Sequence, residues 1–298
     1  MEKTFIDIHC HAFKRPYIWT DGKPLFSTPE QILKIYDKVG IEKGILLPIV
    51  NPEVYLPQSN EEILEICEKY KDRFIPFCNI DPRALTNSPD ADFEPILNYY
   101  KSLGCKGIGE VMPNLPFLDE RVLNLFKYVE KVGFPLIFDG NGAIGNTYGL
   151  YDDPGLPQLE KCLSIFPKLK FLGHGPSFWA EISILKDIND RKRYPKYPVI
   201  EEGVVPKLMR KYSNLYGDLS AGSGYNALAR DLNYAVEFLN EFQDILLFGT
   251  DICRPDQEIP IVDFLLNLVE KGKISKRVFD KIMRENAIKL LNLKQGEK

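Results

Sequence analysis

The sequence predicts an α/β fold, a single (β/α)8 TIM barrel over residues 1–298, and three observations support it. Eight apolar runs of strand length recur along the chain. Amphipathic segments of helical length separate them, and strands alternating with helices are typical of a parallel α/β architecture. A chain of 298 residues also has the length of one such barrel, which commonly takes about 250 residues.

The expected strands are apolar or small at nearly every position rather than at alternate positions, as strands covered on both faces are. In chain order these runs are residues 5–9, 44–50, 74–80, 105–111, 135–139, 169–174, 214–220 and 245–251. The pattern therefore predicts eight buried strands.

Amphipathic stretches lie around and between these runs, and several open with residues that begin helices. The phrase TPEQ offers Thr28 as an N-cap, Pro29 at the first helical position and an acid, Glu30, after it. The expected helices are residues 28–39, 59–71, 92–103, 119–132, 156–166, 203–212, 226–242, 259–271 and 275–291.

A doubly wound open sheet is the rival architecture. Its dinucleotide-binding version would carry GxGxxG after the first strand, and this chain has none there. One segment breaks the alternation: residues 187–199, DINDRKRYPKYPV, are charged and contain prolines. We expect it to be an excursion after the sixth strand, either a solvated loop or a lid or oligomer contact.

Composition argues against two classes of partner. A net charge of -4 and a pI of about 5.6 disfavour nucleic acid, which usually requires a basic face. No run approaches the roughly 20 apolar residues of a membrane span, and residues 5–9 are too few for a signal peptide. The six cysteines form no CxxC pair and are expected to be reduced. We therefore expect a cytoplasmic protein that contacts neither nucleic acid nor membrane.

Polar residues gather at the ends of the expected strands, where a barrel of this kind carries its reacting groups. The chain has only three histidines, and all of them, His9, His11 and His174, come at strand ends. Because side chains alternate along a strand, His9 and His11 project from one face and could chelate a metal such as Zn. The alternative is a polar pair that closes the strand, with each ring bonded to a carbonyl. Acids also occupy strand ends: Glu110, Asp139 and Asp251.

The phrases FIDIHCH, GIGEV, LGHGPSFW and LLFGTD occur in this order over nearly the whole chain. Together they resemble the amidohydrolase superfamily of metal-dependent barrels, and within it the amidohydrolase-related group that includes aminocarboxymuconate-semialdehyde decarboxylase. The resemblance implies a divalent metal at the barrel mouth, usually Zn, with Mn or Fe as alternatives. It implies His9, His11 and Asp251 as the ligands.

Two positions depart from the pattern of that group. It usually has a metal-binding histidine at the end of strand five, where this chain reads PLIFDGNG and carries Asp139. An aspartate can ligate Zn or Mn through oxygen, so the site either keeps a harder ligand set or binds metal weakly or not at all. The phrase GIGEV resembles the GEIG phrase of TatD-type deoxyribonucleases, which implies Glu110 as a further ligand. A salt bridge with Lys106 or a turn cap is the alternative for Glu110.

The resemblance and the strand-end residues together predict a metal-dependent hydrolase that attacks a small ester, lactone, amide or carboxylated substrate through a metal-activated water. Asp251 would bind the metal and accept the proton, and His174 would polarise the substrate or move a proton. A non-oxidative decarboxylase of the same fold and a metal-free ligand-binding barrel are the alternatives. Acidic charge and the missing strand-five histidine disfavour a phosphodiesterase or nuclease.

Residues beside the expected mouth are candidates for contact with a small-molecule substrate. Arginine together with aromatic side chains there favours a carboxylated compound. Members of the group often pair, so a homodimer is one expectation. The candidates, each shortly after a strand-end histidine or acid, are Arg15, Tyr17, Trp179 and Arg254.

Overall fold

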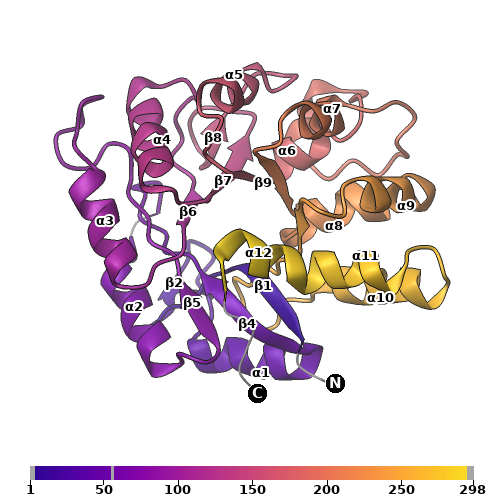
Figure 1. Cartoon of the computed structure of the whole chain (residues 1–298), viewed down its shortest axis with the longest axis horizontal. Coiled ribbons are helices and arrows are strands. Elements are labelled where there is room, and N and C mark those ends of the chain that lie inside the picture. Colours follow the sequence, from indigo (N-terminus) through magenta and orange to yellow (C-terminus); the bar gives the residue numbers. More distant parts are fainter. Residues whose placement is uncertain (1–3, 55–56, 294–298) are drawn as a thin grey trace.

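The computed structural model describes residues 4–54 and 57–293, and the eight expected strands all occur in it (Figure 1). Their ends differ from the predicted ones by several residues at some positions, because hydrogen bonding rather than apolarity sets them. The strands are β1 (Phe5–Cys10), β4 (Ile41–Leu46), β5 (Phe74–Pro76), β6 (Ile108–Val111), β7 (Leu136–Asn141), β9 (Phe171–His174), β10 (Leu215–Asp218) and β11 (Leu246–Leu247).

The strands pair in parallel in the order of a (β/α)8 barrel. One sheet runs β1-β4-β5 and the other β11-β10-β9-β7-β6. A parallel bridge between Cys78 and Ile108 joins β5 to β6. At the other seam, a bridge between Cys10 and Ile252 joins β1 to the segment after β11, and the Asp251 amide donates to the His9 carbonyl at 2.8 Å. The strand ends that carry the predicted site residues therefore meet at one end of the barrel.

Helices surround the strands (Figure 1), and most begin where the sequence predicts. In α1, the Thr28 side chain accepts from the Gln31 amide and the Gln31 side chain accepts from the Thr28 amide, a capping box. The helices that match prediction are α1 (Pro29–Val39), α2 (Asn60–Lys69), α3 (Glu94–Ser102), α4 (Glu120–Val132), α5 (Pro157–Ile165), α7 (Val204–Lys211) and α10 (Pro260–Glu270).

Two predicted helices are wrong as single elements. Residues 226–242 belong to α8 (Ala221–Ala229) and α9 (Leu232–Glu241), because the Asp231 side chain accepts from the Tyr234 amide and begins a new helix. Residues 275–291 divide into α11 (Lys276–Asp280), a π-helical turn (Lys281–Glu285) and α12 (Asn286–Leu291). The β2–β3 hairpin (Tyr17–Ile18 and Pro24–Leu25), β8 (Leu150–Tyr151) and α6 (Pro176–Ala180) have no counterpart in the prediction.

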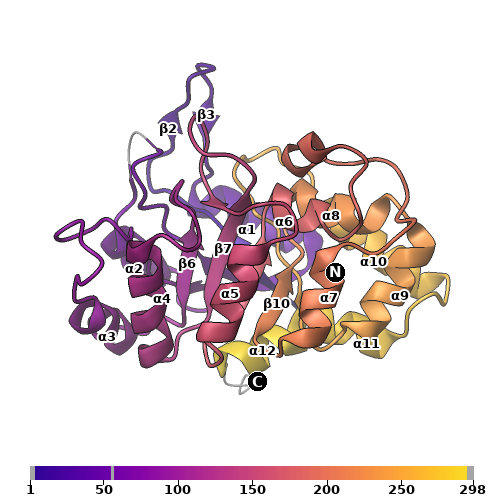
Figure 2. The same cartoon turned by 90° about the horizontal axis from the view of Figure 1, so that it is seen from above.

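Helix α12 covers one end of the barrel, and the β2–β3 hairpin stands at the opposite end (Figure 2). Alanine and leucine side chains of α12 pack onto an inner cluster contributed by six strands or the residues directly after them. That cluster includes Ile6, Ile8, Ile45, Leu47, Phe77, Ile137, Leu172 and Leu247. The barrel interior is therefore a packed core below the site, as in other barrels of this type.

The excursion after the sixth strand is mostly exposed, as the solvated-loop interpretation predicts, but it is tied to the barrel through Arg191. It contains a 3-10 helix (Ile188–Lys192) in which Arg191 is only 3% exposed. The Arg191 Nε atom lies 2.6 Å from Glu181 Oε1, and its Nη1 donates to the Asp152 carbonyl at 2.8 Å.

The structure contains no helix, within residues 4–54 and 57–293, that is long and apolar enough to cross a bilayer. All six cysteines are free, as predicted.

Replacing Gly107 by alanine is expected to destabilise the barrel by about 1–3 kcal/mol, the usual cost of overpacking a core. A Cβ atom at Gly107 would lie 2.4 Å from Cζ of Phe77, whose ring is fully buried in the inner cluster. Chemical denaturation followed by circular dichroism measures the change. Ser102→Ala at the exposed end of α3 is the control and should change stability by less than about 0.5 kcal/mol.

Candidate metal centre

The histidine pair lies at the carboxyl end of β1, with both rings on the inner side. Cys10 between them faces outward, where Tyr36 of α1 donates its hydroxyl proton to the Cys10 sulfur at 2.9 Å. The Asp7 carboxylate accepts from the His9 and Thr250 amides at 3.0 and 2.8 Å. Asp7 thereby holds β1 in register with the segment that carries Asp251.

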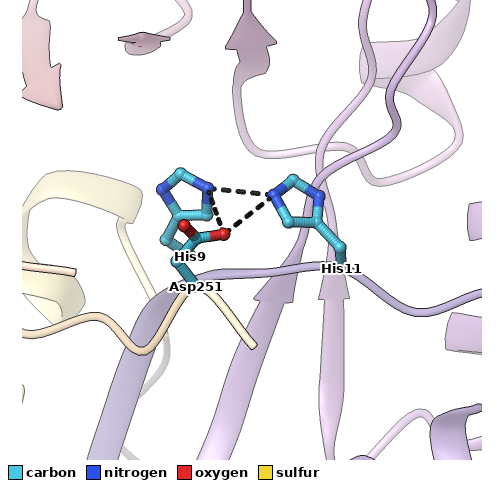
Figure 3. Close-up of side chains that lie close together, drawn as sticks. All are labelled: His9, His11 and Asp251. Carbon is cyan, nitrogen blue, oxygen red and sulfur yellow. Dashed lines mark hydrogen bonds and ion pairs between the residues drawn. The ribbon is translucent and has the colours of Figure 1, made fainter. Parts of the chain in front are cut away.

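Three ligand-type atoms converge at this end of the barrel (Figure 3). Nε2 of His9 lies 3.1 Å from Nε2 of His11. Oδ1 of Asp251 lies 3.6 Å from the first and 3.4 Å from the second of these nitrogens. Asp251 reaches this position with a left-handed φ of 51°, a conformation that non-glycine residues seldom adopt.

Glu110 at the end of β6 joins the same cluster. Its Oε2 atom lies 3.6 Å from Nε2 of His9 and 3.5 Å from Nε2 of His11. Its Oε1 atom lies 3.7 Å from Nε2 of His174. Among the described residues, the ion pairs of Glu110 are with these three histidines, so the alternative salt bridge with Lys106 does not form.

Asp139, at the strand-five position, does not join the triad of His9, His11 and Asp251. One of its oxygens lies within 4.8 Å of ligand atoms of Glu110 and His174 instead. Burial raises the pKa of Asp139 well above its usual range, and the charges of Glu110 and Asp251 add to this effect.

Hydrogen bonds from the Nδ1 atoms of His9 and His11 fix the orientation and the tautomer of the two imidazoles. Nδ1 of His11 lies 2.9 Å from the Leu47 carbonyl, and Nδ1 of His9 lies 2.7 Å from Oδ2 of Asp218. A carbonyl and a carboxylate oxygen can only accept, so both Nδ1 atoms carry the proton. In the neutral rings, both Nε2 lone pairs then point into the cluster, the arrangement that metal-binding histidines show.

The surrounding carboxylates make the centre of the cluster favourable for positive charge. Burial alone would lower the pKa of His9, but Asp218, Glu110 and Asp251 raise it well above its usual range. Burial acts in the same direction on His11, and hydrogen bonds with Asp251 and Glu110 raise its pKa to about 9. A proton or a metal cation can supply the positive charge that these carboxylates favour.

The donor set fits a divalent metal. Two atoms that bind one zinc ion at about 2.1 Å each lie about 3–4 Å apart, and the four atoms from His9, His11, Glu110 and Asp251 meet this condition at each distance given above. Two imidazoles with carboxylates are suited to Zn, Mn or Fe.

The substrate-binding candidates lie in three different settings. Trp179 is 1% exposed and donates from Nε1 to the Asp218 carbonyl at 2.8 Å, so it packs in the core and its predicted contact with substrate is wrong. Tyr17 packs against Phe13 in a small cluster beside the hairpin. Arg15 is exposed, and Arg254 is half exposed with Nη2 3.6 Å from Oδ2 of Asp21.

Asp218 is the site residue that sequence reasoning missed. It ends β10 and is fully buried behind His9 and His174. The available signal was its place at the end of the seventh expected strand, the same signal that singled out Glu110 and Asp139.

Replacing Asp218 by asparagine is expected to weaken metal binding by about 10–100-fold, as loss of a hydrogen-bond partner behind a ligating histidine usually does. The asparagine amide oxygen is uncharged, so it accepts the hydrogen bond from Nδ1 of His9 less strongly than the Asp218 carboxylate does. Titration against a competing chelator measures the affinity, with Asp153→Asn on the surface as the control. Equal affinities for the two variants would contradict the role given to Asp218.

Comparisons with known proteins agree with the predicted family and fold. The family model described as Amidohydrolase matches residues 6–293. None of the curated proteins matches the chain by sequence. Solved structures similar to the chain include an uncharacterised TIM-barrel protein from Bordetella bronchiseptica, at 17% identity over 97% of this chain and 98% of that chain with a TM-score of 0.64.

Two further similar structures come from proteins described by an activity. A candidate 2-pyrone-4,6-dicarboxylic acid hydrolase from Pseudomonas putida is 14% identical over 99% of this chain and 100% of that chain, with a TM-score of 0.62. A 2,6-dihydroxybenzoate decarboxylase from Rhizobium is 18% identical over 98% of each chain, with a TM-score of 0.58. At these identities the likeness establishes the fold, a TIM barrel.

Proposed function

The chain belongs to the amidohydrolase family, and we propose that it is a metal-dependent hydrolase of small esters, lactones, amides or carboxylated compounds. The observation that carries this proposal is the convergence of His9 Nε2, His11 Nε2 and Asp251 Oδ1 at one end of the barrel. With Glu110, these residues would hold a divalent cation, Zn in the first place and Mn or Fe as alternatives. Such a cation, when bound, polarises a carbonyl oxygen and lowers the pKa of a water molecule.

Asp251 is suited to hold and pass on a proton. Oδ1 faces the histidine pair, whereas Oδ2 lies 3.9 Å from Nε2 of His174. Burial would raise the pKa of Asp251, but the charges of His9, His11 and His174 lower it, so the carboxylate is ionised and able to accept. His174 can take the proton from Asp251 Oδ2 or donate one to the leaving group.

A cavity of about 350 Å³ lies beside the cluster, and its volume suits a small-molecule substrate. Asp139 belongs both to the cluster and to the cavity wall, where Tyr148, Ser177 and Lys192 also lie. The charge of Asp139, more than burial, raises the pKa of Tyr148, so its hydroxyl stays protonated and can donate a hydrogen bond. Lys192 would provide a positive charge for a substrate carboxylate.

A non-oxidative decarboxylase is the second candidate, and the pair of Asp251 and His174 favours it as well. The same two groups that move a proton during hydrolysis could deliver it to a substrate carbon while carbon dioxide leaves. The Rhizobium decarboxylase shares the fold but is too distant in sequence to decide between the two reactions.

Two assays on the metal-loaded protein separate these functions. We expect the protein to release acid from some members of a panel of lactones, esters and amides. The rate of acid release should fall by at least about 100-fold in Asp251→Asn, because the proton acceptor is lost. Asp153→Asn should match the unmodified chain. Carbon dioxide release from aromatic or enoic acids without ester or lactone cleavage would contradict hydrolysis and support decarboxylation. Binding of such acids without either reaction would support the metal-free or non-catalytic alternative.

We further propose a cytoplasmic protein that acts on a small molecule and not on nucleic acid. Six free cysteines and a net charge of -4 support this proposal. The homodimer stays a prediction, which light scattering during gel filtration would test.

A further inference from the structure

Another cavity lies at the end of the barrel that α12 covers, opposite the histidine pair (Figure 2). It holds about 280 Å³. Its walls come from the first halves of β1, β4 and β5, with Ile6, Lys43 and Phe74, and from Ile288 of α12. The proposed metal ligands come from the opposite ends of the strands, so this cavity is separate from the metal centre.

The floor of this cavity is apolar. Ile6 and Phe74 are each 2% exposed, and the half-buried Ile75 and Ile288 pack on the inner cluster. A neighbouring hollow of about 260 Å³ shares Phe74 with the cavity and adds Leu103, directly after α3, whose side chain is 45% exposed. An apolar ring or short chain that lies along this floor would leave water favourably.

Cations surround the opening of the cavity, and the only acid in its described lining is Glu42. Glu42 forms an ion pair with Arg284, which also donates from Nη1 to the Thr4 carbonyl at 2.7 Å. The other cations of the lining form no ion pair with any residue in 4–54 and 57–293, and they are Lys43, Lys71 and Lys106. Three positive charges therefore stay uncompensated here, although acids outnumber bases in the chain by 42 to 38.

The fold accounts for only one of these lysines. Lys71 follows the end of α2 at Lys69, where the helix dipole favours a cation. Lys43 is inside β4 and half-buried, and Lys106 comes two residues before β6, so neither is in the last turn of a helix. Like charges around one opening repel one another, so the free protein gains no stability from this arrangement, whereas a bound anion would be stabilised by it.

We propose that this cavity binds a phosphate monoester of an apolar alcohol, with the phosphate among Lys43, Lys71 and Lys106 and the organic group on the apolar floor. A phosphate monoester carries about −1.5 to −2 charges at pH 7 and three acceptor oxygens, which suit three ammonium donors. The volume of the cavity is close to the lower end of the range of about 300–1,000 Å³ for ligand pockets, so the organic group is small. Because no residue of the metal centre takes part, the site stands whether or not the chain is a hydrolase.

Isothermal titration calorimetry of the metal-loaded full chain with 1-naphthyl phosphate tests the site. We expect one equivalent to bind per chain. Inorganic phosphate lacks the apolar group, 1-naphthol lacks the charge, and 1-naphthoate carries a single negative charge. Each of these three compounds should therefore bind at least about 10-fold more weakly than 1-naphthyl phosphate.

Two lysine variants test where the compound binds. Lys43→Met combined with Lys106→Met keeps the apolar stems and removes two charges. It should weaken binding by about 10-fold or more, because hydrogen bonds between charged groups are the strong ones. Lys106→Met alone removes an exposed charge and should weaken binding as well, so the result does not depend on the folding of the double variant.

Lys127→Met combined with Lys161→Met is the matched control. Both side chains are exposed, on α4 and α5, and the control removes the same charge, so it should bind 1-naphthyl phosphate as the unmodified chain does. Equal affinities of the Lys43 and Lys106 double variant and this control would overturn the site.

Two further results would also overturn the proposal. They are the absence of binding to the unmodified chain at concentrations up to about 1 mM, and binding of 1-naphthoate as tightly as 1-naphthyl phosphate. The double variant His9→Ala with His11→Ala should bind 1-naphthyl phosphate with unchanged affinity, because those rings lie at the other end of the barrel. Failure of this site and failure of the proposed metal centre are therefore measured separately.

Discussion

Replacing His9 and His11 together by alanine is expected to abolish binding of the proposed divalent cation and to lower kcat/KM by more than about 10³-fold. The two rings supply both nitrogen ligands of that ion, and the remaining carboxylates alone bind a borderline metal poorly. Loss of even an outer hydrogen-bond partner costs about 10–100-fold, so loss of two direct ligands must cost more. Metal analysis and initial rates on the purified variant measure the two effects.

Cys10→Ala is the matched control for this variant. Cys10 lies between the two histidines on the same strand, but its side chain faces Tyr36 and the helix layer. The control should therefore keep its metal and its activity. A double histidine variant that binds Zn as tightly as the Cys10 variant would show that the rings are not ligands.

Replacing Arg191 by methionine is expected to destabilise the protein by about 3–5 kcal/mol, the usual cost of removing one partner of a buried ion pair. Methionine fills much of the space but leaves the buried charge of Glu181 without Arg191, which lies 2.6 Å from it. It also removes the hydrogen bond to the Asp152 carbonyl that ties the excursion to the barrel. Chemical denaturation followed by fluorescence measures the loss.

Two further variants separate the ion pair from general damage. Glu181→Gln combined with Arg191→Met removes both charges and should recover part of the lost stability. Lys192→Met changes the exposed neighbour and should shift stability by less than about 0.5 kcal/mol. Equal stability of Arg191→Met and Lys192→Met would contradict the anchoring role of Arg191.

The architecture was predictable because the strands are buried on both faces. Such strands read as continuous apolar runs, and their order alone places eight strand ends at one mouth. The point where one helix ends and the next begins was harder to predict, since the amphipathic pattern continues across Arg230 and Asp231. Only the hydrogen bond that the Asp231 side chain accepts from the Tyr234 amide shows where α9 begins.

The direct ligands were predictable from the alternation of side chains along a strand, which puts His9 and His11 on one face. Their partners were not. The place of Asp218 at a strand end marks it as a candidate, but its contact with His9 spans 209 positions of sequence, and no local pattern shows which side chain it contacts. Trp179 was predicted to contact substrate because it follows His174 closely in sequence. In the structure, α6 directs its ring into the core.

Anomalous scattering from crystals of the zinc-loaded protein tests the central claim most directly. The account predicts a peak at the zinc edge that lies about 2.0–2.2 Å from Nε2 of His9, Nε2 of His11 and a carboxylate oxygen of Asp251. A zinc-loaded crystal with these three side chains bonded to one another or to water, and with the anomalous peak elsewhere, would contradict it.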